Sequence, residues 1–133
     1  MGLSGYVRFL GFVEDMAGFL SMLNVQLNCS TLSEACSLSI IEGMSLGLPT
    51  VASRCSGNPW LVEDGVTGFL FENGDARSLT DALTALMDDP AAAKVMGTAA
   101  RRAYESRFTG EIFAANLEQI YDDILKKKGG SSR

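Results

Sequence analysis

Two carboxylates, Glu34 and Glu42, lie eight residues apart where a short apolar run gives way to a helical pattern. In an open α/β sheet, ligands bind where the carboxyl end of a strand meets the start of a helix. The backbone N–H groups near Ser37 and Leu38 would have no partner within the helix, and the helix dipole adds partial positive charge there. We therefore predict a diphosphate site that uses no basic side chain.

The two glutamates suit different tasks. Glu42 lies just over one turn into the expected helix, where its carboxylate can accept two hydrogen bonds from vicinal ribose hydroxyls. Glu34 lies in the loop before the helix and can face the group that is joined to the distal phosphate. The spacing by itself carries little weight, because glutamates are common and two solvated side chains are the simpler interpretation.

The elements that must position these residues follow from the periodicity of the sequence. Apolar, β-forming runs predict strands at residues 6–10, 25–29, 50–53 and 68–71. Helical patterns at about residues 14–23 and 37–46 separate the first three strands, and Gly47 with Pro49 ends the second helix. Alternating strands and helices indicate an α/β fold with a parallel sheet of about four strands and flanking helices.

The second half of the chain is predicted to be helical. Residues 78–81 resemble a capping box, and residues 88–90 end one helix and start the next. Thr109 is expected to cap a final helix, whose wide apolar stripe needs a partner surface. The stripe consists of Ile112, Phe113, Leu117, Ile120, Tyr121 and Ile124. Residues 129–133 are set apart as a flexible tail.

Composition argues against several classes of protein. The chain has 133 residues, enough for one domain, and a formal net charge of −5. It has no basic face for nucleic-acid phosphates, and the basic run at residues 126–128 is interpreted as complementing the dipole of the last helix. No apolar stretch approaches the roughly 20 residues of a membrane span, and no signal peptide is recognised, so we expect a cytoplasmic protein.

Three cysteines, Cys29, Cys36 and Cys55, occur without any histidine. Their odd number and their spacing support neither a disulfide framework nor a zinc site, so we expect reduced thiols and no metal. Cys36 is expected beside the start of a helix, where the dipole favours a thiolate, and it is therefore predicted to be the most readily alkylated. The alternative is a buried, unreactive thiol.

The wider context of the two glutamates matches a known pattern. Residues 33–52 resemble the E-x7-E segment of glycosyltransferase family 4, a retaining family with the two-domain GT-B fold. Further similarity lies in residues 9–16, 56–68, 73–75 and 88–90. The resemblance covers about residues 6–125, and it is specific as a set although each piece alone is weak.

The resemblance implies a partial Rossmann-like domain at residues 1–128, a truncated C-terminal donor-binding domain of such an enzyme. It implies that Glu34 is catalytic and contacts the transferred hexose-type sugar, while the acceptor attacks from the front face and the leaving diphosphate assists its deprotonation. The donor would be a UDP- or GDP-sugar, with no cofactor and no metal. The implied nucleotide-sugar-binding residues are Glu42, Cys36, Ser37, Leu38, Gly11 and Phe12.

The chain departs from the family pattern in several places. Residues 35–37 replace a glycine-containing sequence, which reduces the backbone freedom of that loop. Trp60 stands where the family commonly has Glu, and we expect its indole to be packed. Two strand–helix units and the N-terminal acceptor domain of the family are not in the chain. The fragment alone is therefore expected to be catalytically inactive.

The missing units affect the expected sheet. By the resemblance, two strands are absent between residues 7–10 and 25–29, which would leave both runs without neighbours. Either these runs pair within one chain, or two chains pair or exchange strands about a two-fold axis. We favour a symmetric homodimer, because the final helix also lacks a surface to cover.

Three other interpretations stay open. The chain could belong to a nucleotide-sugar epimerase that shares the GT-B architecture. It could also be a non-catalytic, self-associating fragment. A doubly wound domain with an unknown ligand would be favoured if the loop at Glu34 were turned away from the carboxyl edge of the strands.

Overall fold

The computed structural model describes residues 2–32 and 35–129. Within them a parallel sheet has the strand order β1-β2-β3. The strands are β1 (Gln26–Asn28), β2 (Thr50–Ser53) and β3 (Gly68–Phe71). The α/β fold with a parallel sheet is therefore confirmed, and each of these strands lies where the sequence predicted one.

The central strand, β2, has a partner on each side. Thr50 is opposite Gln26 of β1 and opposite Gly68 of β3. All four residues of β2 are buried, and its successive side chains point to opposite faces of the sheet. Val51 therefore belongs to one hydrophobic cluster and Ala52 to another.

Six helices complete the described part of the chain. They are α1 (Met16–Ser21), α2 (Leu38–Ser45), α3 (Asn58–Leu61), α4 (Ala76–Asp88), α5 (Pro90–Arg107) and α6 (Gly110–Gly129). Side chains of α2 and α3 join Ala52 in one core cluster, whereas side chains of α4 join Val51 in the other. The long helix α5 contributes to both clusters, through Ala100 to the first and Met96 to the second.

The end of α2 is held against α5 at backbone distance. Gly47, which follows α2, has a φ of 73°, a left-handed conformation that favours glycine. A Cβ atom built on Gly97 of α5 would lie 2.1 Å from the carbonyl oxygen of Gly47. Two glycines therefore allow α5 to approach the α2–β2 connection more closely than side chains would permit.

Most helix starts follow the sequence, with one correction. Asp89 caps α5 by accepting from Ala92 N at 2.9 Å, and Thr109 caps α6 as predicted, by accepting from Ile112 N at 3.3 Å. The capping box predicted at residues 78–81 is wrong. Asp75 caps α4 instead, because its carboxylate reaches the amides of residues 77 and 78, so the helix begins at Ala76.

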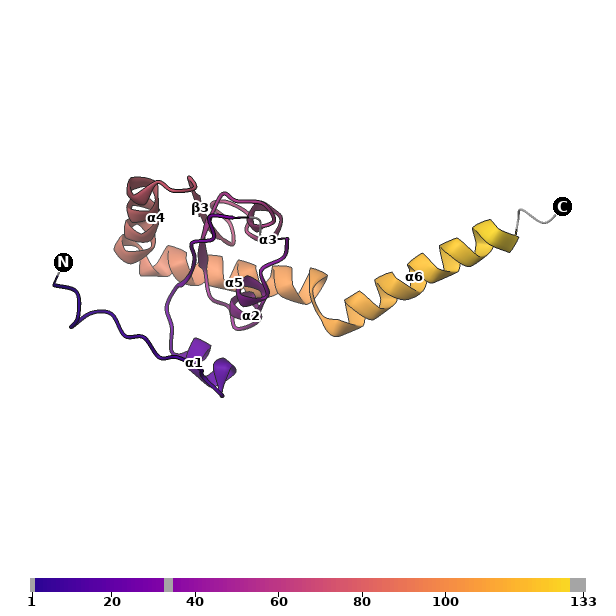
Figure 1. Ribbon diagram of the computed structural model, residues 1–133, viewed down its shortest axis with the longest axis horizontal. Coiled ribbons are helices and arrows are strands. Elements are labelled where there is room, and N and C mark those ends of the chain that lie inside the picture. Colours follow the sequence, from indigo (N-terminus) through magenta and orange to yellow (C-terminus); the bar gives the residue numbers. More distant parts are fainter. Residues whose placement is uncertain (1, 33–34, 130–133) are drawn as a thin grey trace.

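The strand predicted at residues 6–10 is also not observed. The N–H groups of Tyr6 and Val7 donate to the carbonyl oxygen of Leu3, in a turn, and residues 2–12 are exposed. Figure 1 shows this N-terminal segment, in indigo, running outside the body that the sheet and helices form. This run does not pair with any strand of the described sheet. Pairing of residues 7–10 with residues 25–29 inside one chain is therefore not the arrangement seen.

The final helix has the apolar stripe that the sequence predicted. Phe113, Ile120 and Tyr121 are all exposed, as are Leu117 and Ile124. Figure 1 shows α6 leaving the end of α5 and projecting away from the sheet. The helix extends to Gly129, the first residue of the expected tail, and residues 130–133 lie outside those described.

Candidate functional site

The carboxyl ends of the three strands form one edge of the sheet. Because the strands are parallel, the loops that follow Asn28, Ser53 and Phe71 all begin at this edge. Helix α2 follows β1, and α3 follows β2, so both helices also start there. The edge predicted to bind a ligand is thus built from three loops and two helix N-termini.

Helix α2 begins with open amides. Its N-cap residue, Ser37, has an extended backbone and makes no side-chain cap hydrogen bond. The first helical bond runs from Ile41 N to Ser37 O at 3.3 Å. Within the described residues, the N–H groups of Leu38, Ser39 and Ile40 therefore have no acceptor, and the surface around Leu38 and Ser39 is exposed.

Ser37 does not cap α2 because its hydroxyl is engaged elsewhere. Asn28 Nδ2 donates to Ser37 Oγ at 3.0 Å, and Ser37 Oγ lies 2.9 Å from Ser39 Oγ. The side chain of Ser37 is buried. A residue at the end of β1 thus holds the hydroxyl that would otherwise satisfy an amide of α2.

Asn28 is itself held by a second asparagine. Asn58 Nδ2 lies 3.2 Å from Asn28 Oδ1, 3.0 Å from Ser53 O and 3.3 Å from Ser53 Oγ. Asn58 and Ser53 are fully buried. We call Ser53, Asn58, Asn28 and Ser37 the asparagine bridge, since they join the end of β2 to the start of α2.

The loop after β1 is tied down on its other side as well. Ser53 Oγ donates to Ser30 O at 2.6 Å, and Cys55 Sγ lies 3.1 Å from Leu32 O. Asn73 Nδ2, from the loop after β3, donates to Thr31 O at 3.3 Å. These bonds fix residues 30–32 at the carboxyl edge. Glu34, the predicted catalytic residue, lies outside the described residues.

Glu42 lies on the exposed side of α2. It is four residues after Leu38, so the two side chains share one face of the helix. The opposite face carries Ile40, Gly43 and Met44 into the core. Side chains of a helix lean towards its N-terminus. Glu42 and Leu38 therefore lie on one exposed face of α2, and Cys36 and Ser37 come directly before that helix.

Two other predictions have different outcomes. Gly11 and Phe12 lie in the exposed N-terminal segment, where Phe12 is 93% exposed. No interaction within the described residues joins them to the start of α2, so their role at the nucleotide base stays a prediction. Trp60 was expected to be packed, and this is wrong. Its side chain is 79% exposed on α3, a helix whose inward residues are Asn58 and Leu61.

Arg54 forms ion pairs with two carboxylates at this edge. Arg54 directly follows β2, and its guanidinium donates to Asp64 at 2.8 Å and to Glu72 at 3.1 Å. The hydrogen bond to Asp64 raises the pKa of Arg54 further above its ordinary value. This cation is therefore committed to two carboxylates. A diphosphate here would be met by the open amides and not by Arg54.

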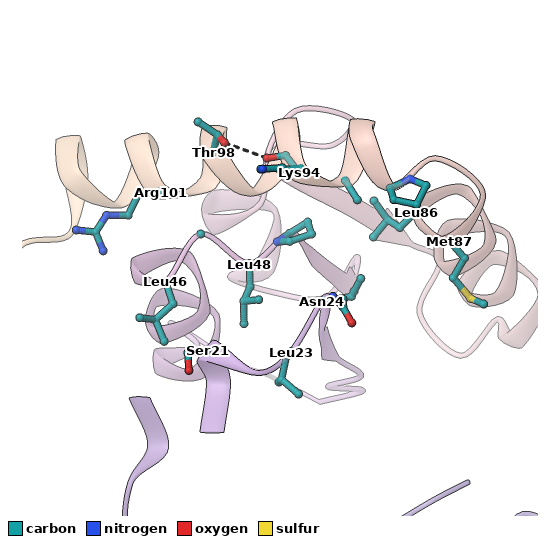
Figure 2. A pocket seen from close by; sticks show the side chains of 15 residues that line it. Ser21, Leu23, Asn24, Leu46, Leu48, Leu86, Met87, Lys94, Thr98 and Arg101 are labelled. Carbon is teal, nitrogen blue, oxygen red and sulfur yellow. Dashed lines mark hydrogen bonds between the residues drawn. The ribbon is translucent and has the colours of Figure 1, made fainter. Parts of the chain in front are cut away.

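A cavity lies at the opposite edge of the sheet. It has a volume of about 850 Å³, and Val25 and Pro49, which precede β1 and β2, help to line it. Figure 2 shows Leu46 and Leu48 on one side and Lys94 of α5 on the other. The walls are mainly apolar, and the carboxyl-edge residues are not among them. We place the ligand site at the carboxyl edge because bound ligands in open α/β sheets occupy that edge.

Comparison with known proteins identifies the family. The model of the family described as "Glycosyl transferases group 1" matches residues 1–89, two thirds of the 133 residues. This chain belongs to the group 1 glycosyltransferases. Its resemblance to glycosyltransferase family 4 is thereby confirmed.

Curated relatives and solved structures agree with this assignment. An N-acetyl-alpha-D-glucosaminyl L-malate synthase of Bacillus anthracis is 32% identical over 120 residues, 90% of this chain and 31% of that protein. HepE from Anabaena, solved in complex with UDP, has a TM-score of 0.84 and 29% identity, covering 94% of this chain and 34% of HepE. A sucrose-phosphate synthase from Thermosynechococcus elongatus has a TM-score of 0.86 and 31% identity, covering 94% of this chain and 32% of that one.

The coverage of these matches shows how much of each relative this chain corresponds to. The chain spans about a third of the length of the curated relatives it matches. Its sheet and flanking helices have the GT-B glycosyltransferase fold. Across residues 2–32 and 35–129, no helix is both long and apolar enough to cross a membrane, and no group of three or more metal-ligating side chains is assembled.

The asparagine bridge is the feature of this glycosyltransferase that the sequence did not reveal. Its hydrogen-bonded pairs lie 5, 9 and 30 residues apart, so no local pattern connects all four members. A signal was nevertheless present. Asn28 and Ser53 are polar residues at the carboxyl ends of two predicted strands, where side chains meet at one edge.

The structure sharpens the prediction for the thiols. Cys36 is exposed beside the start of α2, and Cys55 is buried. Cys29 is exposed as a residue, yet partial burial of its thiol raises its pKa. A raised pKa lowers the thiolate fraction at neutral pH, and the thiolate is the reactive form. We expect iodoacetamide to label Cys36 faster than Cys29 at pH 7, and Cys55 slowest of all.

Peptide mass spectrometry after timed labelling measures these three rates. Raising the pH above 7 should bring the labelling rates of Cys36 and Cys29 closer together, because a larger fraction of the Cys29 thiol is then ionised. Faster labelling of Cys29 than of Cys36 at pH 7 would contradict the placement of Cys36 at an open helix start.

Proposed function

We propose that this chain is the donor-binding part of a retaining glycosyltransferase that transfers a hexose-type sugar from a nucleotide diphosphate sugar. The observation that carries the proposal is the open start of α2 with Glu42 on the same face, at the carboxyl edge of the sheet. Its support is the family, together with the UDP and UDP-glucose bound to HepE, a protein 29% identical to this chain. The donor is a UDP- or GDP-sugar.

The site acts mainly by stabilising negative charge. The exposed amides of Leu38 and Ser39 bind the diphosphate, and they are already oriented before the reaction begins. Glu42 accepts hydrogen bonds from the ribose hydroxyls. As the bond from the sugar to the diphosphate breaks, negative charge grows on the leaving group, and preorganised donors stabilise it without rearranging.

Glu34 completes the proposed site. By the E-x7-E resemblance it contacts the transferred sugar near the reacting carbon, where the acceptor oxygen attacks from the face that the diphosphate leaves. The leaving diphosphate takes the proton of the acceptor hydroxyl. The acceptor is bound by a separate N-terminal domain, and the 133-residue chain alone is not catalytically competent. The enzyme is cytoplasmic.

A second proposal concerns the isolated polypeptide, which we infer to be a symmetric homodimer. In the described sheet, β1 pairs with β2 on one side, and its other edge has no strand beside it. An open strand edge is a template for pairing with another chain. The exposed stripe of α6 offers further apolar area. A two-fold axis would let both surfaces of one chain be covered by its partner.

The ribose assignment predicts the effect of Glu42→Ala. In the intact enzyme, this change should weaken binding of UDP or GDP by about 1.5–3 kcal/mol, roughly 10- to 150-fold in Kd, because it removes hydrogen bonds to a charged group. Isothermal titration with both nucleotides measures the change. Glu118→Ala, at an exposed position of α6, is the matched control and should leave Kd unaltered. Unchanged affinity of Glu42→Ala for both nucleotides would sink the ribose assignment.

A different signature is expected for Glu34→Gln. An interaction made mainly in the transition state is lost from kcat and leaves ground-state binding nearly intact. We therefore expect turnover of the intact enzyme to fall at least about tenfold, with donor affinity within about twofold of wild type. Steady-state kinetics with varied donor separates the two effects, and Glu63→Gln serves as the control. Wild-type turnover in Glu34→Gln would end the catalytic assignment.

The dimer is tested on the 133-residue polypeptide itself. Light scattering after size exclusion at micromolar concentrations should give twice the monomer mass of 14.2 kDa. Phe113→Asp combined with Ile120→Asp should shift the equilibrium towards monomer, because two charges would be buried at the contact. A monomer at every concentration would show that the proposal is wrong.

A further inference from the structure

We propose that Asn28 and Asn58 are positioning residues that keep the start of α2 uncapped, so that its amides stay available to the donor diphosphate. This inference rests on the proposed function. It goes further by assigning a task to two residues that do not themselves touch the nucleotide. The asparagine bridge transmits the position of β2 to the hydroxyl of Ser37.

The direction of each hydrogen bond in the bridge is fixed by its neighbours. Ser30 N donates to Asn28 Oδ1 at 3.1 Å, and a backbone N–H can only donate. The amide nitrogen of Asn28 is therefore turned to Ser37 Oγ. Ser53 O can only accept, so the nitrogen of Asn58 faces it. Asn58 thus donates to Asn28, and Asn28 donates to Ser37.

Helix α2 differs from α1, α4 and α5, whereas α3 likewise starts without a side-chain cap hydrogen bond. The helices α1, α4 and α5 start with an aspartate whose carboxylate accepts from an amide of the first turn, at 2.8 to 2.9 Å for the shortest bond of each. Ser37 is also a preferred capping residue, yet it caps nothing. Serine at this position normally accepts from the second or third amide of the helix. The bridge is the feature that prevents this at α2.

An open helix start matters because a cap and a diphosphate compete for the same donors. A hydroxyl on the exposed amide of Ser39 would have to be displaced before a phosphate oxygen could take its place. Holding Ser37 Oγ away removes that step. The anchor is rigid, since Asn58 and Ser53 are fully buried. Asn58 Oδ1 is buried without a partner in the described residues, so the nitrogen alone fixes this side chain.

The test compares Asn28→Leu with a double variant. Leucine has the same number and branching of side-chain heavy atoms as asparagine but cannot donate, so the hydroxyl of Ser37 loses this hydrogen bond and becomes able to cap α2. We expect amide hydrogen exchange of Ser39 or Ile40 to slow about tenfold, the effect of one good cap, and UDP binding to the intact enzyme to weaken by a similar factor. Adding Ser37→Ala removes the new cap, and both properties should return to within about threefold of wild type.

Rescue by a second truncation distinguishes positioning from a structural role, because damage to packing would add up and not cancel. Gln119→Leu is the control. It removes a side-chain amide hydrogen bond to Asp123 on α6, away from the carboxyl edge, and it should change neither readout. If Asn28→Leu fails to fold, Ser37→Ala alone decides. Its exchange at Ser39 and Ile40 should match wild type, since the hydroxyl does not cap α2.

The outcomes separate this inference from the proposed function. Three results would overturn the proposal that α2 is kept uncapped. Amide exchange in Asn28→Leu could equal that of wild type, or the double variant could show the same exchange and UDP affinity as Asn28→Leu. The third result is faster amide exchange in Ser37→Ala. If amide exchange slows in Asn28→Leu while UDP binding stays at the wild-type level, the proposal that α2 is kept uncapped still stands. That result would overturn the link to the diphosphate, and with it the proposed ligand site.

Discussion

The parallel pairing of β2 with a strand on each side is the constraint from which the site follows. Parallel strands place all their carboxyl ends at one edge, so the loops after β1, β2 and β3 must meet there. The same geometry makes α2 and α3 start at that edge. Because β2 is buried along its whole length, its last residue, Ser53, is a rigid anchor in the middle of the edge.

The charged side chains around Arg54 at this edge are paired with one another. The guanidinium of Arg54 is occupied by Asp64 and Glu72, and it joins the loop after β2 to the end of β3. Asp64 also accepts from Leu70 N at 2.9 Å, which fixes the carboxylate. Such exposed ion pairs add little to stability individually. Their effect is on position, and they leave backbone dipoles as the donors that face outward from α2.

The features that the sequence predicted are those with a local cause. Residues 50–53 and 68–71 are short β-forming runs bounded by turn residues, and the structure has strands at those positions. Thr109 caps α6 as predicted, since a cap acts over three residues. The start of α4 was misplaced because Asp75 and Ser78 are both capping residues, and only the fold shows that Ser78 Oγ instead accepts from Glu72 N.

The features that the sequence did not predict depend on partners far along the chain. Residues 6–10 have the composition of a strand, but they do not pair with any strand of the described sheet. Trp60 is exposed because α3 turns Asn58 and Leu61 inward. Asn28 gains its role from Asn58, thirty residues later. Spacing placed Glu42 and Ser37 at the start of one helix, but only the fold shows why that start is open.

The contact between Gly47 and Gly97 has a consequence for the order of folding. These residues are fifty positions apart. The strands of each parallel pair are likewise joined by a long crossover connection and not by a tight hairpin turn. The entropy of closing such loops must be lost before packing can offset it, so formation of the sheet is slow and cooperative. On a growing chain, α2 emerges well before α5. The helix that carries the open amides therefore reaches its final packing only after residue 97 has been synthesised.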